Sequence, residues 1–345
     1  MTNGEIRVDG SRGSFISTRK LLGFLIFSVV VFALVGWYGK VDDVISALIA
    51  IPWFWILPTM MTLSFLNYVL RYFKWQYYLN RINVNLTHTD SFGVFLAGFT
   101  LTATPGKIGE AVKGYFIQEI DGTPVAKTMP IVVSERVTDL LAMAILALVG
   151  FTLGISAGDQ LFTVILLGGA ALIGALVLGN RAFYQRILVR MTSFGPLKRF
   201  QDSCDLIEST MTKTLSPKPM LVSTAISVPG WFMECIELWL LLSILSGVGL
   251  PSLTFASLSL LLSATFVHST ASIIGAVTMS PGGVGTYEIT SVALITYLLA
   301  MGETLASAAT ILIRVVTLWF SIVVGFIALA IITRRIKRKR ESSTS

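Results

Sequence analysis

The stretch TLASAATILIRVVTLWFSIVVGFIALAIIT, residues 304–333, is apolar almost throughout and is followed directly by RRIKRKR, residues 334–340. A transmembrane helix needs about 20 mostly apolar residues to cross a hydrocarbon core of roughly 30 Å. The first stretch is long enough to cross with some tilt. The Lys and Arg residues that follow are typical of the cytoplasmic flank of a span. The sequence therefore predicts a membrane helix that ends in the cytoplasm.

Similar apolar runs cover most of the chain. Of the 345 residues, 54% are hydrophobic and only 13% are charged, and the mean hydropathy is +0.77. This composition leaves no segment for a soluble catalytic domain. We expect an all-α polytopic membrane protein with about eight transmembrane helices. The predicted spans are residues 20–38, 53–79, 128–154, 161–180, 220–247, 254–280, 286–301 and 304–333.

Charge asymmetry predicts the orientation. The connector 181–218 contains seven Lys and Arg residues, whereas the connectors at the opposite side contain one, Lys40. By the positive-inside rule, the basic side is cytoplasmic. We therefore expect a cell (inner) membrane protein with both termini in the cytoplasm. Its predicted parts are a cytoplasmic segment 1–19, a transmembrane domain 20–333 with a cytoplasmic amphipathic connector 181–219, and a basic tail 334–345.

Two shorter apolar stretches lie between the second and third spans. The first runs from Ser91 to Thr104 and is broken by Pro105-Gly106; the second runs from Ala111 to Ile120. Each is too short to cross, so we expect a re-entrant helix pair.

The break recurs in the second half of the chain. Residues 102–109 and 278–285 both have the form Thr-x-Thr/Ser-Pro-Gly-x-Ile/Val-Gly. Paired Gly/Pro-interrupted apolar segments in corresponding halves are typical of transporters whose site lies at the repeat interface. We therefore expect a two-fold internal repeat. Each motif is followed by a glutamate and then by an arginine within a span: Glu110 and Arg136 after the first, Glu288 and Arg314 after the second.

Ionisable residues inside spans are costly and need a partner or a task. Glu135, Arg136 and Asp139 are spaced to share one helix face. One interpretation is an ion-pair network that holds helices together. The other is that Arg136 binds a phosphate in a bidentate geometry. The two interpretations are compatible, since a carboxylate can hold an arginine ready for a ligand.

Lys107 and Lys113 lie beside glycines at an expected helix start, where backbone N–H groups favour an anion such as a phosphate headgroup. The alternative is that Pro105-Gly106 only turns the loop and the lysines extend to the interface. The second motif lacks lysines, so binding there would involve backbone groups and neighbours such as Tyr287. His268 lies among hydroxyl side chains, and we interpret it as hydrogen-bonded to them rather than as a site residue. The aromatic residues at the inner end of span 53–79 resemble an interface belt.

The net charge of +7 is concentrated beside apolar spans, without interleaved aromatic residues. We therefore expect anionic membrane lipids as partners rather than nucleic acid, the alternative being that these charges only set the topology. No cofactor or metal site is expected, because the two cysteines form no ligand pattern.

Three ordered motifs resemble a known family: residues 105–110 (PGKIGE), 134–139 (SERVTD) and 281–288 (PGGVGTYE). The chain is similar, from about residue 20 to 335, to the lysylphosphatidylglycerol synthase transmembrane-region family of flippase-like proteins. In multiple peptide resistance factors this region moves aminoacylated phosphatidylglycerol between leaflets and is fused to a cytosolic synthase. The present chain ends shortly after its last span, so we expect a stand-alone domain without aminoacyl-transferase activity. Stand-alone relatives are associated with glycosylation, which implies a polyprenyl-phosphate sugar as another cargo.

The leading hypothesis is a lipid translocator, not an enzyme, for a phosphate-bearing lipid. Alternatives are an integral-membrane transferase with Glu135, Asp139 or Glu110 as general base, a scaffold for a separately encoded glycosyltransferase or synthase, and an ion-coupled carrier for a soluble solute. The expected headgroup-binding residues are Lys107, Glu110, Lys113, Glu135, Arg136, Asp139, Tyr287, Glu288 and Arg314. The expected backbone turns are at Pro105, Gly106, Gly109, Pro281, Gly282, Gly283 and Gly285.

Overall fold

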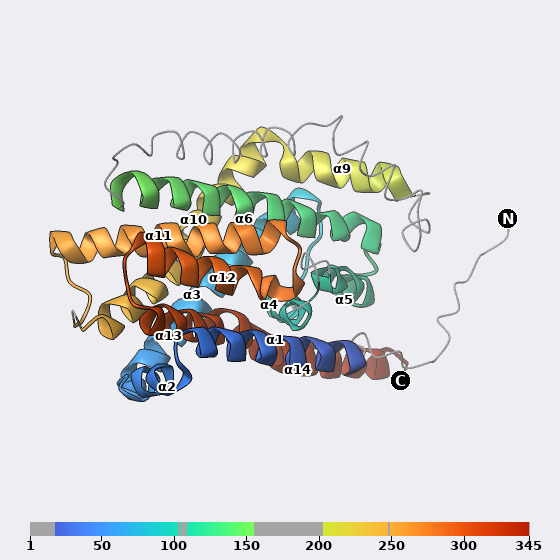
Figure 1. Cartoon of the computed structure of the whole chain (residues 1–345). Coiled ribbons are helices and arrows are strands. Elements are labelled where there is room, and N and C mark those ends of the chain that lie inside the picture. Colours follow the sequence, from blue (N-terminus) through green and yellow to red (C-terminus); the bar gives the residue numbers. More distant parts are fainter. Residues whose placement is uncertain (1–17, 103, 105–108, 155–202, 248, 345) are drawn as a thin grey trace.

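The computed structural model describes residues 18–102, 104, 109–154, 203–247 and 249–344, and every regular element in these ranges is helical. Helices α1, α6, α11 and α14 run roughly parallel, whereas α3 and α10 cross them obliquely, and α1 begins at the end of the bundle where α14 ends (Figure 1). The all-α prediction is confirmed. The helices are α1 Thr18–Tyr38, α2 Val41–Ile49, α3 Trp53–Arg81, α4 His88–Ala97, α5 Val112–Asp121, α6 Val125–Gly154, α9 Cys204–Leu215, α10 Pro217–Leu245, α11 Phe255–Val277, α12 Thr286–Ala293, α13 Glu303–Arg314 and α14 Phe320–Thr344, with 3-10 turns η1 Gly98–Leu101 and η4 Pro281–Gly283 and π-helical turns η5 Leu294–Leu298 and η6 Val315–Trp319.

Five helical segments in the described part of the chain are long and apolar enough to cross a membrane, or six if one bent pair is counted as a span. The pair is Leu22–Tyr38 with Val41–Ile49, bent by 96°. These segments correspond to six of the eight predicted spans. The predicted span 161–180 lies outside the described residues. The other expected span, 286–301, is a short helix: α12 and η5 together run only from Thr286 to Leu298, fewer residues than the roughly 20 that a crossing needs.

The expected re-entrant region contains two short helices, α4 and α5, and neither is long enough to cross. Thr87 caps α4 by accepting a hydrogen bond from Asp90 N, and Gly122, with φ of +79°, ends α5 in the left-handed conformation. Helix α4 and the 3-10 turn η1 that follows it pack along α14. This close approach requires glycine in α14, because a Cβ added to Gly325 would lie 2.5 Å from Thr100 N.

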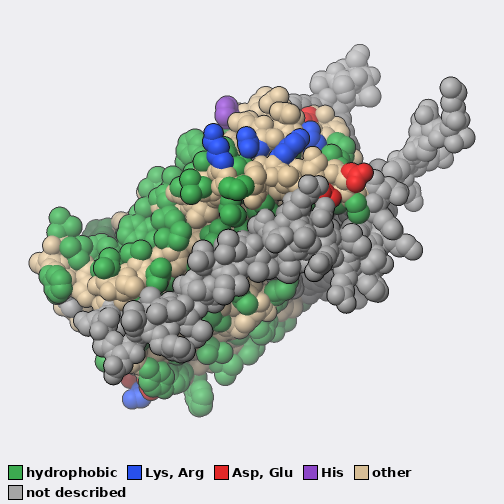
Figure 2. Space-filling model, turned by 90° about the horizontal axis from the view of Figure 1, so that it is seen from above, with side chains coloured by type: hydrophobic (Ala, Val, Ile, Leu, Met, Phe, Trp, Pro, Cys, Tyr) green, Lys and Arg blue, Asp and Glu red, His purple; other side chains and the backbone are tan. Residues whose placement is uncertain are grey.

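Apolar side chains cover the outside of the bundle as well as its interior. Exposed hydrophobic residues follow α1 and α14, including Val29 and Ile331. Figure 2 shows hydrophobic side chains over the flank and most of the visible Lys and Arg side chains toward one end. An apolar flank of this kind suits contact with lipid tails.

The interior contains many polar and charged side chains although the chain as a whole is apolar. Buried charged residues come from α3, α4, α5, α6, α10, α12 and α13, and Glu110, just before α5, is also buried. The interpretation of the aromatic residues near the end of α3 as an interface belt is wrong for Trp75 and Tyr78, which are fully buried in a hydrophobic cluster with α4 and α5. Charged and aromatic side chains thus share the centre of the bundle.

Candidate functional site

A cavity of about 380 Å³ lies among the spanning helices, with walls from α3, η1, α6, α10, α11, η4, α12, α13, η6 and α14. Its apolar lining includes Phe99, Met143 and Trp231. The charged and titratable residues in its wall are Tyr68, Arg71, Arg136, Asp139, Glu234, His268, Tyr287 and Arg314. A chamber of this size, apolar with a few convergent polar groups, is typical of a ligand site.

Arg136 extends from α6 into the cavity, and its guanidinium forms an ion pair with Glu110, which does not line the cavity. Its Nη2 donates to Glu110 Oε2 at 3.0 Å, and its Nη1 lies 3.7 Å from Asp139 Oδ2. The Glu110 side chain is 1% exposed, whereas that of Arg136 is 20% exposed. The carboxylate therefore fixes the guanidinium and leaves part of it accessible from the cavity.

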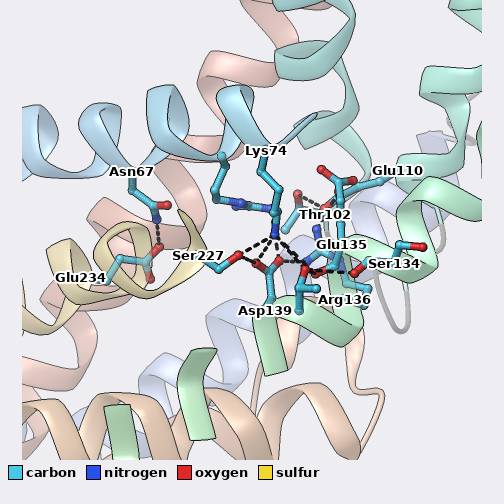
Figure 3. A network of polar contacts seen from close by, with 12 residues as sticks. Asn67, Lys74, Thr102, Glu110, Ser134, Glu135, Arg136, Asp139, Ser227 and Glu234 are labelled. Atoms are coloured by element: carbon cyan, nitrogen blue, oxygen red, sulfur yellow. Dashed lines mark hydrogen bonds and ion pairs between the residues drawn. The ribbon is translucent and has the colours of Figure 1, made fainter. Parts of the chain in front are cut away.

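Asp139, one helical turn after Arg136, binds two cations from α3. Lys74 Nζ donates to Asp139 Oδ1 at 2.5 Å and to Ser227 Oγ on α10 at 2.8 Å. Arg71 Nη2 lies 4.0 Å from Asp139 Oδ2. Figure 3 shows Lys74 reaching from α3 toward Asp139 on α6, with Ser227 beside both. Three helices are thus joined by one carboxylate.

Lys113 and Glu135 form a buried pair that lies next to the Arg136–Glu110 pair. Lys113 Nζ donates to Glu135 Oε2 at 2.6 Å, lies 3.6 Å from Glu110 Oε2, and lies 4.5 Å from the centroid of the Trp75 ring. Both side chains are 1% exposed. This cation is paired with two carboxylates and an aromatic face, and neither Lys113 nor Glu135 belongs to the cavity wall.

The second motif forms an equivalent arginine site. Arg314 Nε donates to Glu288 Oε1 at 2.7 Å, and its Nη2 donates to the Gly282 carbonyl at 2.6 Å. Glu288 Oε2 in turn accepts from Gly285 N at 2.6 Å. The guanidinium carbon lies 4.7 Å from the centroid of the Tyr287 ring. The turn residues of the motif therefore anchor both partners of the ion pair.

This turn needs glycine. Gly282, Gly283 and Gly285 have φ values of +62°, +74° and +89°, a region that other residues rarely adopt. Pro281 begins the 3-10 turn η4, and Gly285 is the N-cap of α12. The Pro-Gly-Gly-x-Gly pattern thus ends α11 and starts a new helix inside the bundle.

The structure divides the predicted site residues into two groups. Arg136, Asp139, Tyr287 and Arg314 line the cavity, together with Gly282 and Gly283. Glu110, Lys113, Glu135 and Glu288 do not line the cavity; the three glutamates form ion pairs with lysine or arginine, and Lys113 is one of the cations that they bind. Gly109 donates from its N to Thr104 Oγ1 at 2.8 Å. Pro105, Gly106 and Lys107 lie outside the described residues.

The expected site did not include Arg71, Lys74, Glu234 or His268, although Glu234 stands out in the sequence as an ionisable residue inside a span. Arg71 and Lys74 lie within the apolar span α3, so their position in a membrane helix was the available signal. The hydrogen bonds expected from His268 to hydroxyls are present, to Tyr287 OH at 2.9 Å and Ser272 Oγ at 3.4 Å. In addition, His268 Nε2 lies 3.2 Å from Glu234 Oε2, and both residues line the cavity.

Among the residues that the structure describes, no group of three or more His, Cys, Asp and Glu side chains is arranged to hold a metal ion.

Comparison with known proteins is consistent with the fold and the motifs. Residues 22–325 match the family model of the lysylphosphatidylglycerol synthase TM region. The chain belongs to this family.

Membership of the family makes the chain a multi-pass membrane protein, and it confirms the resemblance predicted from the three motifs. A relative described as a UPF0104 membrane protein, from Methanothermobacter thermautotrophicus, is 22% identical over 298 residues. The aligned region covers 78% of this chain and 83% of the relative.

Proposed function

We propose that this protein moves a phosphate-bearing lipid between the two leaflets of a membrane, with the headgroup phosphate bound in the central cavity. The main support for the proposal is that arginines in the cavity wall have donors without a hydrogen-bond partner. Arg71, Arg136 and Arg314 all line the cavity. The buried Nε atoms of Arg71 and Arg136 have no hydrogen-bond partner among the described residues. Buried donors without an acceptor call for an explanation, and phosphate oxygens are suitable acceptors.

The carboxylates behind the arginines support this proposal. Glu110 and Glu288 each fix one guanidinium at 3.0 Å or less, so little side-chain freedom remains to be lost when a ligand binds. Arginine suits the task better than lysine, because its planar fork keeps donors for a second acceptor after one side is paired.

The two halves of the chain supply equivalent pairs. Arg136 with Glu110 and Arg314 with Glu288 are both separated by 26 residues, and both follow the shared Pro-Gly motif. This equality supports a two-fold internal repeat with the binding site at its interface, as in many secondary transporters. We further propose a re-entrant pair at α4 and α5 and both termini in the cytoplasm, since α1 begins at the end of the bundle where the Lys- and Arg-rich end of α14 lies (Figure 1).

Two cargo classes fit the same chemistry. An anionic or aminoacylated phospholipid and a polyprenyl-phosphate sugar both present a phosphodiester on an apolar tail. The apolar flank of the bundle suits either tail, because it presents exposed hydrophobic side chains to lipid.

A membrane transferase is the principal alternative, with Glu110, Glu135 or Asp139 as general base. Each of these carboxylates is in contact with at least one lysine or arginine within 3.6 Å. A carboxylate paired with a cation is held in its charged form and is a weaker base. The ion pairs therefore favour translocation over group transfer. A role as a scaffold for a separate glycosyltransferase or synthase would not explain why arginines line the cavity.

The test is leaflet exchange in proteoliposomes. Labelled phosphatidylglycerol and a labelled polyprenyl-phosphate sugar are compared in vesicles with the protein and in protein-free vesicles. The proposal expects exchange of at least one lipid to accelerate with the amount of protein, and the faster lipid identifies the cargo class. Equal rates with and without protein for both lipids would contradict it and favour the scaffold.

A further inference from the structure

Helix α10 carries two carboxyl groups that the arginine pairs do not use. Glu234 lies on the cavity wall, whereas Glu237, three residues further along α10, is completely buried. Asn67 donates to Glu234 Oε1 at 2.5 Å, and His268 Nε2 lies 3.2 Å from Oε2. Ser64 donates to Glu237 Oε1 at 2.8 Å, but Glu237 Oε2 has no hydrogen-bond partner among the described residues. Glu237 thus has a hydrogen-bond partner for only one of its two carboxyl oxygens among these residues.

Among the residues that the structure describes, no lysine, arginine or histidine forms an ion pair with Glu237. Glu234 is the charged neighbour that acts on it electrostatically. The other titratable residues near the two carboxyl groups are Tyr68 on α3, Cys235 on α10 and Tyr287 on α12. The charged residues that share the cavity wall with Glu234 are Arg71 on α3, Arg136 and Asp139 on α6, and Arg314 at the end of α13.

Two carboxyl groups in this setting share a proton more readily than they both ionise. An ionised carboxylate buried without a cation is costly, and two like charges one helical turn apart repel strongly in a medium of low polarity. His268 adds a third proton carrier at hydrogen-bond distance from Glu234.

A chain of contacts connects this carboxyl pair to the phosphate site. His268 Nδ1 lies 2.9 Å from Tyr287 OH, and the Tyr287 ring lies beneath the Arg314 guanidinium, at 4.7 Å. Glu234, Tyr287 and Arg314 also line the same cavity. A phosphate bound by Arg314 would therefore bring negative charge into the space that Glu234 faces.

We propose that Glu234, Glu237 and His268 form a proton-binding site that takes up one proton when a phosphate-bearing headgroup enters the cavity. This inference rests on the proposed function and adds a source of energy to it. Because linkage is reciprocal, a bound proton strengthens phosphate binding by the same factor as the phosphate strengthens proton binding. A pH difference across the membrane would then drive net lipid movement, with the proton and the lipid carried together.

Binding and proton uptake are measured on the purified full-length protein in phosphatidylcholine nanodiscs. The probes are dioctanoyl phosphatidylglycerol and a glucose phosphodiester of a short isoprenoid alcohol. Both are phosphodiesters, so neither has the second ionisation near about pH 6 that a phosphate monoester would add to the signal. The dissociation constant is measured at several pH values, and a pH indicator in weak buffer counts the protons taken up.

For the wild type we expect one proton taken up per lipid bound and a dissociation constant that rises about tenfold per pH unit above the transition. Glu234→Gln should bind lipid with little pH dependence and without uptake. Glu237→Gln should keep uptake but move its midpoint to lower pH, because the like-charged neighbour is gone. Glu303→Gln, which neutralises an exposed glutamate at the start of α13, is the matched control and should behave as the wild type. Thermal unfolding shows that each variant is folded.

Lipid binding with the same affinity at every pH and no proton uptake would overturn the proton site while leaving the phosphate site intact. Uptake that persists in Glu234→Gln, or an unchanged midpoint in Glu237→Gln, would also overturn it. Failure of both probes to bind at any pH would instead overturn the proposed function, and the proton site with it.

Discussion

Arg314 donates from Nε to Glu288 Oε1 at 2.7 Å, inside the bundle and at the wall of its cavity. The same guanidinium donates to the Gly282 carbonyl and lies on the Tyr287 ring. Its position is therefore fixed on three sides by residues of one short motif. An arginine held in this way is prepared for a ligand on its remaining side.

The planar shape of Arg314 leads to the first prediction. We expect Arg314→Lys to reduce protein-dependent lipid exchange by at least about tenfold, because an ammonium group cannot contact Glu288, Gly282 O and a phosphate in fixed directions at once. The initial rate of exchange in proteoliposomes measures the effect. Arg338→Lys, in the exposed part of α14, is the control. An unchanged rate in Arg314→Lys would show that charge alone suffices there.

The contact between Lys74 and Asp139 predicts a loss of stability when one of the two residues is replaced. Removal of one partner from a buried ion pair typically costs about 3–5 kcal/mol, because the other charge stays buried without its partner. Lys74 is fully buried and Asp139 nearly so. Thermal unfolding in detergent should show a large destabilisation for Lys74→Met, and Lys74→Met with Asp139→Leu should lose less than the two single variants added together. Additive losses would mean that the pair is not coupled.

Gly325 predicts a steric effect with a matched control in the same protein. A Cβ there would lie 2.5 Å from Thr100 N and 2.8 Å from Phe99 C, so Gly325→Ala must separate α14 from η1. Overpacking of this kind costs about 1–3 kcal/mol. A Cβ at Gly36 on α1 would meet nothing within 4 Å. Thermal unfolding should therefore show a lower midpoint for Gly325→Ala and not for Gly36→Ala; equal midpoints would contradict the packing.

Substitution of Lys113 tests whether this residue of the first motif has a structural or a binding role. It lies behind the cavity wall, paired with Glu135 at 2.6 Å. We expect Lys113→Met to lower the unfolding temperature through loss of this pair, while the exchange rate per folded molecule falls less than in Arg136→Met. If Lys113→Met abolishes exchange without lowering stability, the lysine binds the lipid directly.

The sequence was sufficient to predict the class of fold and the family, because long apolar runs, flanking basic charge and three motifs are local features. It also placed Arg136 and Arg314 in equivalent positions of two similar segments. It did not predict which charged residues face the cavity. Arg136 and Lys113 look alike as cations near a Pro-Gly break, yet only Arg136 lines the cavity.

That distinction depends on packing between distant segments. Lys74 meets Asp139 across a separation of 65 residues, and Asn67 meets Glu234 across 167. Helical periodicity says nothing about such pairs. The same limit explains why the aromatic residues of α3 were interpreted as an interface belt, since aromatic side chains suit a membrane interface and a buried cluster equally well.

The most direct test of the central claim is the rate of leaflet exchange for the lipid that the wild type moves fastest, measured in proteoliposomes with matched protein content. We predict that Arg136→Ala combined with Arg314→Ala reduces the rate to that of protein-free vesicles, while Arg338→Ala keeps the wild-type rate, with all proteins inserted and folded. Exchange that continues at the wild-type rate without both cavity arginines would contradict the claim that they bind the headgroup phosphate during translocation.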